Sequence, residues 1–100
     1  MKPVIVHGEA SAELDEAVAY YEQQQPGLGL RLLSDVQRTV TRIQLNPQLG
    51  TPYKETAFRR ALVRRFPYVV FYADLENAIW VIAVTHAKRR PDYWRQRHVG

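Results

Sequence analysis

The sequence contains no cysteine, and this absence excludes several kinds of site at once. A 100-residue chain without cysteine forms no disulfides, binds no metal through thiolates and has no thiol nucleophile. Its three histidines, His7, His86 and His98, are too scattered to give the spacing of a metal site. We therefore expect neither a metal nor another cofactor.

Long apolar runs are missing as well. No segment approaches the ~18 consecutive apolar residues of a membrane span. The apolar run near the N-terminus is too short for a secretory signal. There are also no internal repeats and no low-complexity segments. A chain of this length has room for one compact core, so we expect a single domain over residues 1–100, in the cytoplasm and without a membrane partner.

The two halves of the chain differ in charge. The net charge is +4, but residues 1–50 hold four basic and six acidic side chains, whereas residues 51–100 hold ten basic and four acidic ones. A basic half indicates an anionic partner, either nucleic acid or an acidic protein segment. The alternative is a basic surface that only interacts with solvent, and charge alone does not decide between the two.

The first half predicts one strand and two helices. A β-branched run over residues 3–7 predicts the strand. Ser11 is a candidate N-cap for the first helix, and glycine and proline at residues 26–29 separate it from the second. The second helix should end at Asn46, because a residue before proline avoids the helical conformation. The apolar stripes are Leu14, Ala17, Val18 and Tyr21 in the first helix and Leu33, Val36, Val40 and Ile43 in the second.

The second half predicts three strands after a loop over residues 46–57. β-branched and aromatic residues mark the strands at 58–63, 68–73 and 78–85, with a turn at 74–77. We expect an α+β fold of order β-α-α-β-β-β, with the helical hairpin on one face of a mostly antiparallel four-stranded sheet. The last two strands lack polar alternation, so both of their faces should be covered. Either the C-terminal segment or a partner protein must cover the face opposite the hairpin.

Four arginines lie in or beside the first of these strands. Strand alternation predicts Arg59 and Arg65 on one face and Arg60 and Arg64 on the other. One interpretation is phosphate or carboxylate binding, because guanidinium offers a rigid bidentate fork. The other is protection of an exposed sheet edge by charge.

The last strand continues into a cationic, aromatic tail. His86 ends the strand and is suited to general acid-base chemistry near neutral pH, although a histidine there often only forms hydrogen bonds. With arginines holding a phosphate, His86 or Tyr93 could move the proton in metal-free RNA cleavage, and Glu55 is a weaker candidate base. For Trp94 we favour packing on the sheet over stacking on a base. The candidate partner- or anion-binding residues are Arg59, Arg64, Lys88, Arg89, Arg90, Trp94 and Arg95.

The order of the motifs is similar to that in the RelE/ParE superfamily of toxins from type II toxin-antitoxin modules, also called plasmid-stabilisation proteins. The resemblance rests on residues 12–17, Asn46–Pro47 with Gly50, and residues 64–72, 81–86 and 89–94. It covers nearly the whole chain. It implies a growth-inhibiting toxin neutralised by a small antitoxin that wraps over it.

The superfamily contains two mechanisms. The RelE-like members cleave mRNA at the ribosome, and the resemblance matches Arg65, His86 and Tyr93 to catalytic residues found in such nucleases. Their lysine-rich catalytic loop is reduced here to Lys54. The ParE-like members inhibit DNA gyrase, and residues 66–68 with the tail at 90–94 are closer to that branch.

We therefore expect a ParE-like inhibitor of DNA gyrase that acts as a binding module. The second hypothesis is a ribosome-dependent mRNA endoribonuclease that uses Arg65, His86 and Tyr93. The third is an inactive homologue that serves only in a complex regulating its own operon.

Overall fold

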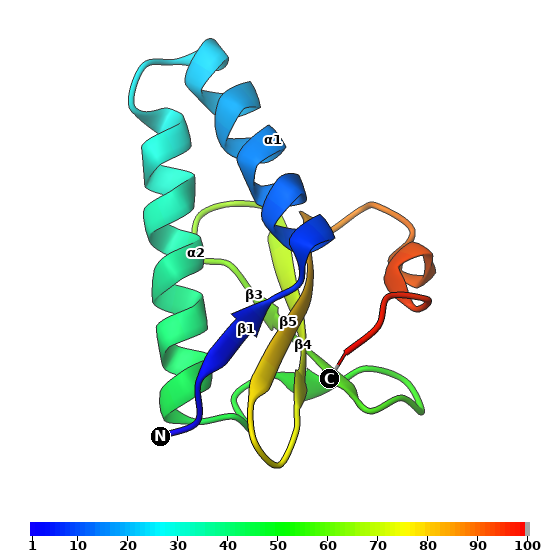
Figure 1. Ribbon diagram of the computed structural model, residues 1–100. Helices are drawn as coiled ribbons and strands as arrows, with labels where there is room; N and C mark the ends of the chain where they lie inside the picture. Colours follow the sequence, from blue (N-terminus) through cyan, green and yellow to red (C-terminus); the bar gives the residue numbers. More distant parts are fainter. Residues whose placement is uncertain (100) are drawn as a thin grey trace.

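A computed structural model describes residues 1–99 and places a helical hairpin against a five-stranded sheet (Figure 1). The strands lie in the order β1-β5-β4-β3-β2, and only the β1–β5 pair is parallel. The elements are β1 (Val4–Val6), α1 (Gly8–Gln24), α2 (Leu28–Leu45), β2 (Thr51–Pro52), β3 (Phe58–Leu62), β4 (Tyr68–Asp74), β5 (Ile79–His86) and the 3-10 helix η1 (Pro91–Trp94). Within these residues, no helix is long and apolar enough to cross a membrane.

The predicted α+β class and element order are confirmed, with one added strand. The two-residue β2 forms inside the predicted loop, where Thr51 and Pro52 pair with Arg60 and Arg59 of β3. Its proline lies in an edge strand, where a missing backbone N–H does least harm. The second helix ends with Asn46 as its C-cap, as expected.

The predicted start of α1 was wrong. The helix begins at Gly8, and its N-cap is His7, whose Nδ1 accepts a hydrogen bond from the Glu9 amide at 3.1 Å. The His7 amide in turn donates to the Val81 carbonyl at 2.9 Å. Ser11 therefore lies in the first turn and is not the N-cap, because β1 passes into α1 without an intervening loop.

The turn between the two helices depends on glycine and on Glu22. Gly27 has φ of 89°, a left-handed conformation that favours glycine. A Cβ on Gly29 would come within 2.2 Å of the Val18 carbonyl oxygen, so the two helices approach closely here. The Glu22 carboxylate accepts hydrogen bonds from the amides of Gly27 at 2.8 Å and Gly29 at 2.9 Å, and these amides lower its pKa.

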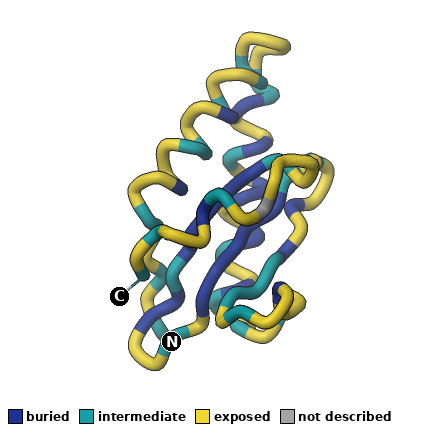
Figure 2. Tube along the Cα trace, turned by 90° about the vertical axis from the view of Figure 1, so that its right-hand side faces the viewer, coloured by how far each residue is buried: buried dark blue, intermediate teal, exposed yellow. Residues whose placement is uncertain are grey.

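Both faces of the central strands are buried (Figure 2). In β4, Val70 and Tyr72 pack with the helices, while Val69 and Phe71 pack with Trp94 of the C-terminal segment. Figure 1 shows this segment on the side of the sheet away from α2. The central strands lack polar alternation because both of their faces are buried. The C-terminal segment of the chain covers much of the face opposite the helices.

Candidate functional site

Two basic segments lie together at one end of the sheet. The β3–β4 turn, residues 63–67, ends beside the start of the tail, because the Ala87 amide donates to the Pro67 carbonyl at 2.8 Å. Tyr68 at the start of β4 pairs with His86 at the end of β5. The fold thus brings exposed cations from distant parts of the chain to the same end of the sheet. They are Arg64, Arg65, Lys88, Arg89 and Arg90.

His86 is half-buried at this end and is partly held in place. Its Nδ1 accepts a hydrogen bond from the Lys88 amide at 3.1 Å, which puts the proton of the neutral ring on Nε2. The ring packs edge-on against Tyr68, with centroids 5.6 Å apart. Arg89 and Glu16 line the same shallow hollow as His86. The geometry leaves Nε2 available for a contact with a ligand.

Tyr93 is tied to α1. Its hydroxyl donates a short hydrogen bond to the Glu13 carboxylate, and the Arg89 guanidinium lies over its ring, 3.9 Å from the centroid. Burial and the bond to Glu13 raise the pKa of Tyr93. The phenol therefore stays protonated near neutral pH and acts as a hydrogen-bond donor within the fold, which makes it a poor general base.

Glu13 and Arg97 cover an open stretch of the β5 edge. Strand β1 pairs with β5 at residues 79–81, and beyond them no other strand of the described residues lies beside β5 on that side. The Glu13 carboxylate accepts from the Val84 amide at 3.2 Å, and Arg97 donates to the Ile82 carbonyl at 2.9 Å. The two side chains also form a double ion pair at 2.9 and 3.0 Å. This pair takes the place of a longer β1 and fastens the C-terminal segment across the sheet edge.

The Glu13 carboxylate is held in its ionised form. Burial alone would raise the pKa of Glu13, but the hydrogen bonds from Arg97 and Tyr93, the charge of Arg97 and the Val84 amide together lower it. The sequence pattern did not identify either Glu13 or Arg97 as a contact of the tail. No local pattern links two residues that lie 84 positions apart.

Arg65 points toward the helices rather than toward the tail. It has φ of 69° in the β3–β4 turn, and its guanidinium pairs with the buried Asp35 of α2 at 3.4 Å. Because β3 ends at Leu62, the alternation used to place Arg64 and Arg65 does not extend to them. Arg59 lies in the strand and is half-buried, and it donates to the Gly50 carbonyl at 2.7 Å. This contact gives Arg59 a structural role.

Two of the predicted partner-binding residues lie in the C-terminal segment, and one of them, Trp94, is a core residue. Trp94 is fully buried among Tyr53, Phe58 and Phe71, so its assignment as a partner contact is corrected and the packing interpretation holds. Arg95 is exposed and lies 3.6 Å from the Asp92 carboxylate. A carboxylate so near reduces its attraction for an anionic partner.

Residues 4–91 match a family described as the ParE toxin of type II toxin-antitoxin system, parDE. The chain belongs to the ParE toxin family. It also resembles a solved structure, the chromosomal ParDE TA system from P. aeruginosa, with a TM-score of 0.77 at 20% identity, over 86% of this chain and 96% of that one. At this sequence identity, the similarity is evidence for the fold alone. No curated protein matches the sequence.

Membership in the ParE family confirms the predicted toxin of a type II toxin-antitoxin system. The RelE/ParE resemblance is confirmed on its ParE side. The matched range ends at residue 91, so Tyr93, Trp94 and Arg97 lie outside it. The ion pair that fastens the tail is therefore a feature of this structure that the family match does not cover.

Proposed function

We propose that this ParE-family toxin inhibits DNA gyrase by binding it, and that it does not cleave RNA. The observation that carries the proposal is that two of the three candidate nuclease side chains are already engaged within the fold. Arg65 pairs with Asp35 of α2, and Tyr93 donates to Glu13. Only His86 keeps a ring nitrogen available, and a single histidine supplies neither the paired acid and base nor a held phosphate.

The exposed cations at the end of the sheet fit a binding role. Arg64, Lys88, Arg89 and Arg90 are solvent-exposed beside one another in the fold, where they can meet an acidic surface without rearrangement of the core. The attraction is electrostatic, so it should weaken as salt screens it. The second candidate function, ribosome-dependent mRNA cleavage, is favoured only by the available Nε2 of His86.

The test compares the native toxin with His86→Gln in two purified assays. In a gyrase supercoiling assay we expect both proteins to inhibit within a few-fold of each other, because the substitution keeps the size of the side chain. In a ribosome-dependent mRNA cleavage assay we expect no cleavage by either. General acid-base catalysis by His86 would instead give cleavage by the native toxin and a loss of roughly 10²–10⁴ in rate for the variant. That result, with supercoiling unaffected, would replace the gyrase proposal with the nuclease one.

For the antitoxin, we infer a docking groove between the helices and β1. Val6, Leu14, Leu33 and Val40 line an open apolar hollow together with residues of β5. Val6 is 46% exposed on the edge strand β1. Exposed apolar surface next to a free strand edge is the kind of surface that a partner segment covers. An amphipathic antitoxin segment would bury its apolar side there.

A further inference from the structure

The outer face of α2 carries a row of arginines, although the first half of the chain has more acidic than basic side chains overall. Arg31, Arg38 and Arg42 are spaced seven and four residues apart, which puts them within about 40° of one another around the helix. The row is about 16 Å long at the rise of an α-helix. All three side chains are exposed, and none forms an ion pair within the part of the chain that the structure describes.

A fourth arginine joins this row from another element. Arg65, in the β3–β4 turn, lines the same hollow as Arg31, Ser34 and Arg38. Asp35 is nearly buried, with 6% of its side chain exposed, and its carboxylate pairs with the guanidinium of Arg65, whose side chain is 66% exposed. Arg65 has φ of 69°, a conformation that is costly for a residue other than glycine. The Asp35 carboxylate thus positions the Arg65 guanidinium beside the helix but offsets part of its charge, so Arg31, Arg38 and Arg42 supply most of the attraction for an anion.

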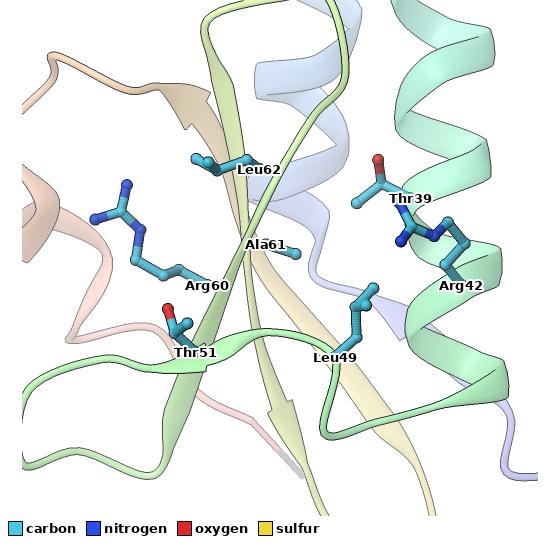
Figure 3. A pocket seen from close by; sticks show the side chains of 7 residues that line it. All are labelled: Thr39, Arg42, Leu49, Thr51, Arg60, Ala61 and Leu62. Atoms are coloured by element: carbon cyan, nitrogen blue, oxygen red, sulfur yellow. The ribbon is translucent and has the colours of Figure 1, made fainter.

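The row continues along α2 with hydroxyl donors. Ser34, Arg38, Thr41 and Arg42 line an adjacent hollow on the same side of the helix. Figure 3 shows Arg42 reaching up beside Thr39, at the rim of the gap between α2 and β3. We define the α2 arginine face as Arg31, Ser34, Arg38, Thr41, Arg42 and Arg65.

Charged and hydroxyl side chains form most of this surface, and the apolar Leu28 and Phe66 that line the hollow beside Arg65 are half-buried. The large apolar side chains that are exposed on α2, Leu30 and Leu45, lie beyond the two ends of the row. Leu62 of β3 is exposed, but in Figure 3 it points away from α2. Binding energy at protein interfaces is concentrated in buried aromatic and aliphatic anchors, whereas nucleic-acid backbones are held by arginine, lysine and hydroxyl donors.

We propose that the α2 arginine face binds the phosphodiester backbone of a nucleic acid. Guanidinium groups pair with phosphate oxygens through two parallel hydrogen bonds, and the Ser34 and Thr41 hydroxyls add neutral donors. Recognition is of the backbone, without base readout. The surface is separate from the tail cations assigned to gyrase binding, so this proposal does not depend on the proposed function.

The test measures binding of the purified full-length toxin to a fluorescent 20-base-pair duplex and to a single-stranded RNA of the same length, from 50 to 300 mM salt. The variant is Arg38→Gln with Arg42→Gln. The matched control is Lys88→Gln with Arg90→Gln, which removes the same charge from exposed positions of the tail. Thermal unfolding of each protein checks that the fold is retained.

Loss of two phosphate contacts should reduce the slope of log K against log salt by about 1.8 on duplex DNA, which is roughly a 60-fold loss of affinity at 0.1 M salt. We expect the control pair to change the slope by less than half of that. Binding to both nucleic acids supports recognition of the shared backbone, and binding to one alone identifies which backbone geometry fits.

Four outcomes would overturn the proposal. The native protein could show no saturable binding at 50 mM salt, or both variant pairs could lose affinity equally, which would mean that only net charge acts. Alternatively, polyglutamate at equal charge could displace the duplex, which would indicate an acidic protein partner. Self-association at low salt that disappears in the Arg38/Arg42 variant would assign the surface to a second copy, whose α1 exposes Asp15 and Glu16.

Discussion

Glu13 is the residue on which the attachment of the tail depends. Its carboxylate contacts a backbone amide of β5, the Tyr93 hydroxyl and the Arg97 guanidinium at once. The side chains of the ion pair are only 13% and 11% exposed. Removal of one member of a buried ion pair is costly, although Arg97 would keep its second ion pair, with Glu9 at 2.8 Å.

We expect Glu13→Gln to lower the free energy of unfolding by about 1–3 kcal/mol at pH 7, because Arg97 keeps its contacts with Glu9 and the Ile82 carbonyl. The folded-state pKa of Glu13 is lowered, so its contribution is fully present above the unfolded value near 4.3 and is lost as the pH falls through the folded value. The difference between native and variant proteins should therefore shrink toward pH 3. Urea unfolding of both proteins at several pH values measures this difference in stability.

Glu16→Gln is the control for this prediction. Glu16 is exposed on the same helix, and its substitution removes the same charge. We expect it to change stability by less than about 0.5 kcal/mol. A Glu13→Gln effect that is independent of pH, or that Glu16→Gln reproduces, would show that the ion pair does not form as described.

At the scale of the elements, η1 works as a cover for the sheet. It is a single turn, and its stability comes from Trp94, which packs on Phe71 of β4 and Phe58 of β3 with ring centroids 4.6 and 4.9 Å apart. The indole nitrogen of Trp94 is buried and has no hydrogen-bond partner within the described residues. The contribution of this side chain is therefore one of packing.

Trp94→Ala should lower the free energy of unfolding by about 3–5 kcal/mol, because buried area is lost and a cavity is left. Trp94→Phe should cost only about 1–2 kcal/mol, because it keeps an aromatic ring and gives up no hydrogen bond. Denaturant unfolding compares the two with Tyr20→Ala, an exposed aromatic that we expect to matter little. If Trp94→Ala were as mild as Tyr20→Ala, the C-terminal segment would not be packed on the sheet in solution.

At the scale of the whole molecule, the toxin has different surfaces on different sides. An apolar groove lies between the helices and β1, cations gather at the end of the sheet, and the α2 arginine face lies on the outside of the hairpin. The groove and the α2 arginine face share Thr41 but no arginine, so a partner that covers the groove can leave the arginines free. Antitoxin binding and anion binding should therefore be separable by mutation.

Val6→Asp should weaken binding of the antitoxin by at least roughly 30-fold, because it puts a carboxylate into an apolar contact. Ile5→Asp is the matched control, since Ile5 is the adjacent residue of β1, 39% exposed, and strand alternation turns it to the opposite side. Binding to the antitoxin encoded beside the toxin is measured with purified proteins, and rescue of growth on co-expression gives a second readout. Equal weakening by both variants would rule out the groove as the docking site.

The antitoxin should also stabilise the native toxin. A ligand at 100 times its dissociation constant adds about 2.7 kcal/mol to the stability of the state that it binds. The melting temperature should rise with antitoxin concentration for the native toxin and for Ile5→Asp, but much less for Val6→Asp.

The sequence by itself determined the type and order of the helices and of the longer strands, but not the two-residue β2. Apolar residues at helical spacing, such as Val36 and Ile43, predicted the packed side of α2, and the uninterrupted apolar strands predicted that both faces of β4 and β5 are covered. Trp94 could be assigned to packing because it follows a strand with one face left open. These features depend on periodicity along the chain, which a single sequence displays directly.

Only the tertiary structure decided how the functional side chains are used. Glu13 and Tyr93 lie 80 positions apart, and Arg65 and Asp35 lie 30 apart. The prediction from strand alternation failed for Arg64 and Arg65, because β3 ends at Leu62. Both residues lie in the turn, where side chains do not alternate between the two faces of the sheet. Hydrogen bonds and ion pairs act over a few ångströms in space, so their partners are fixed by how the elements pack and not by spacing along the chain.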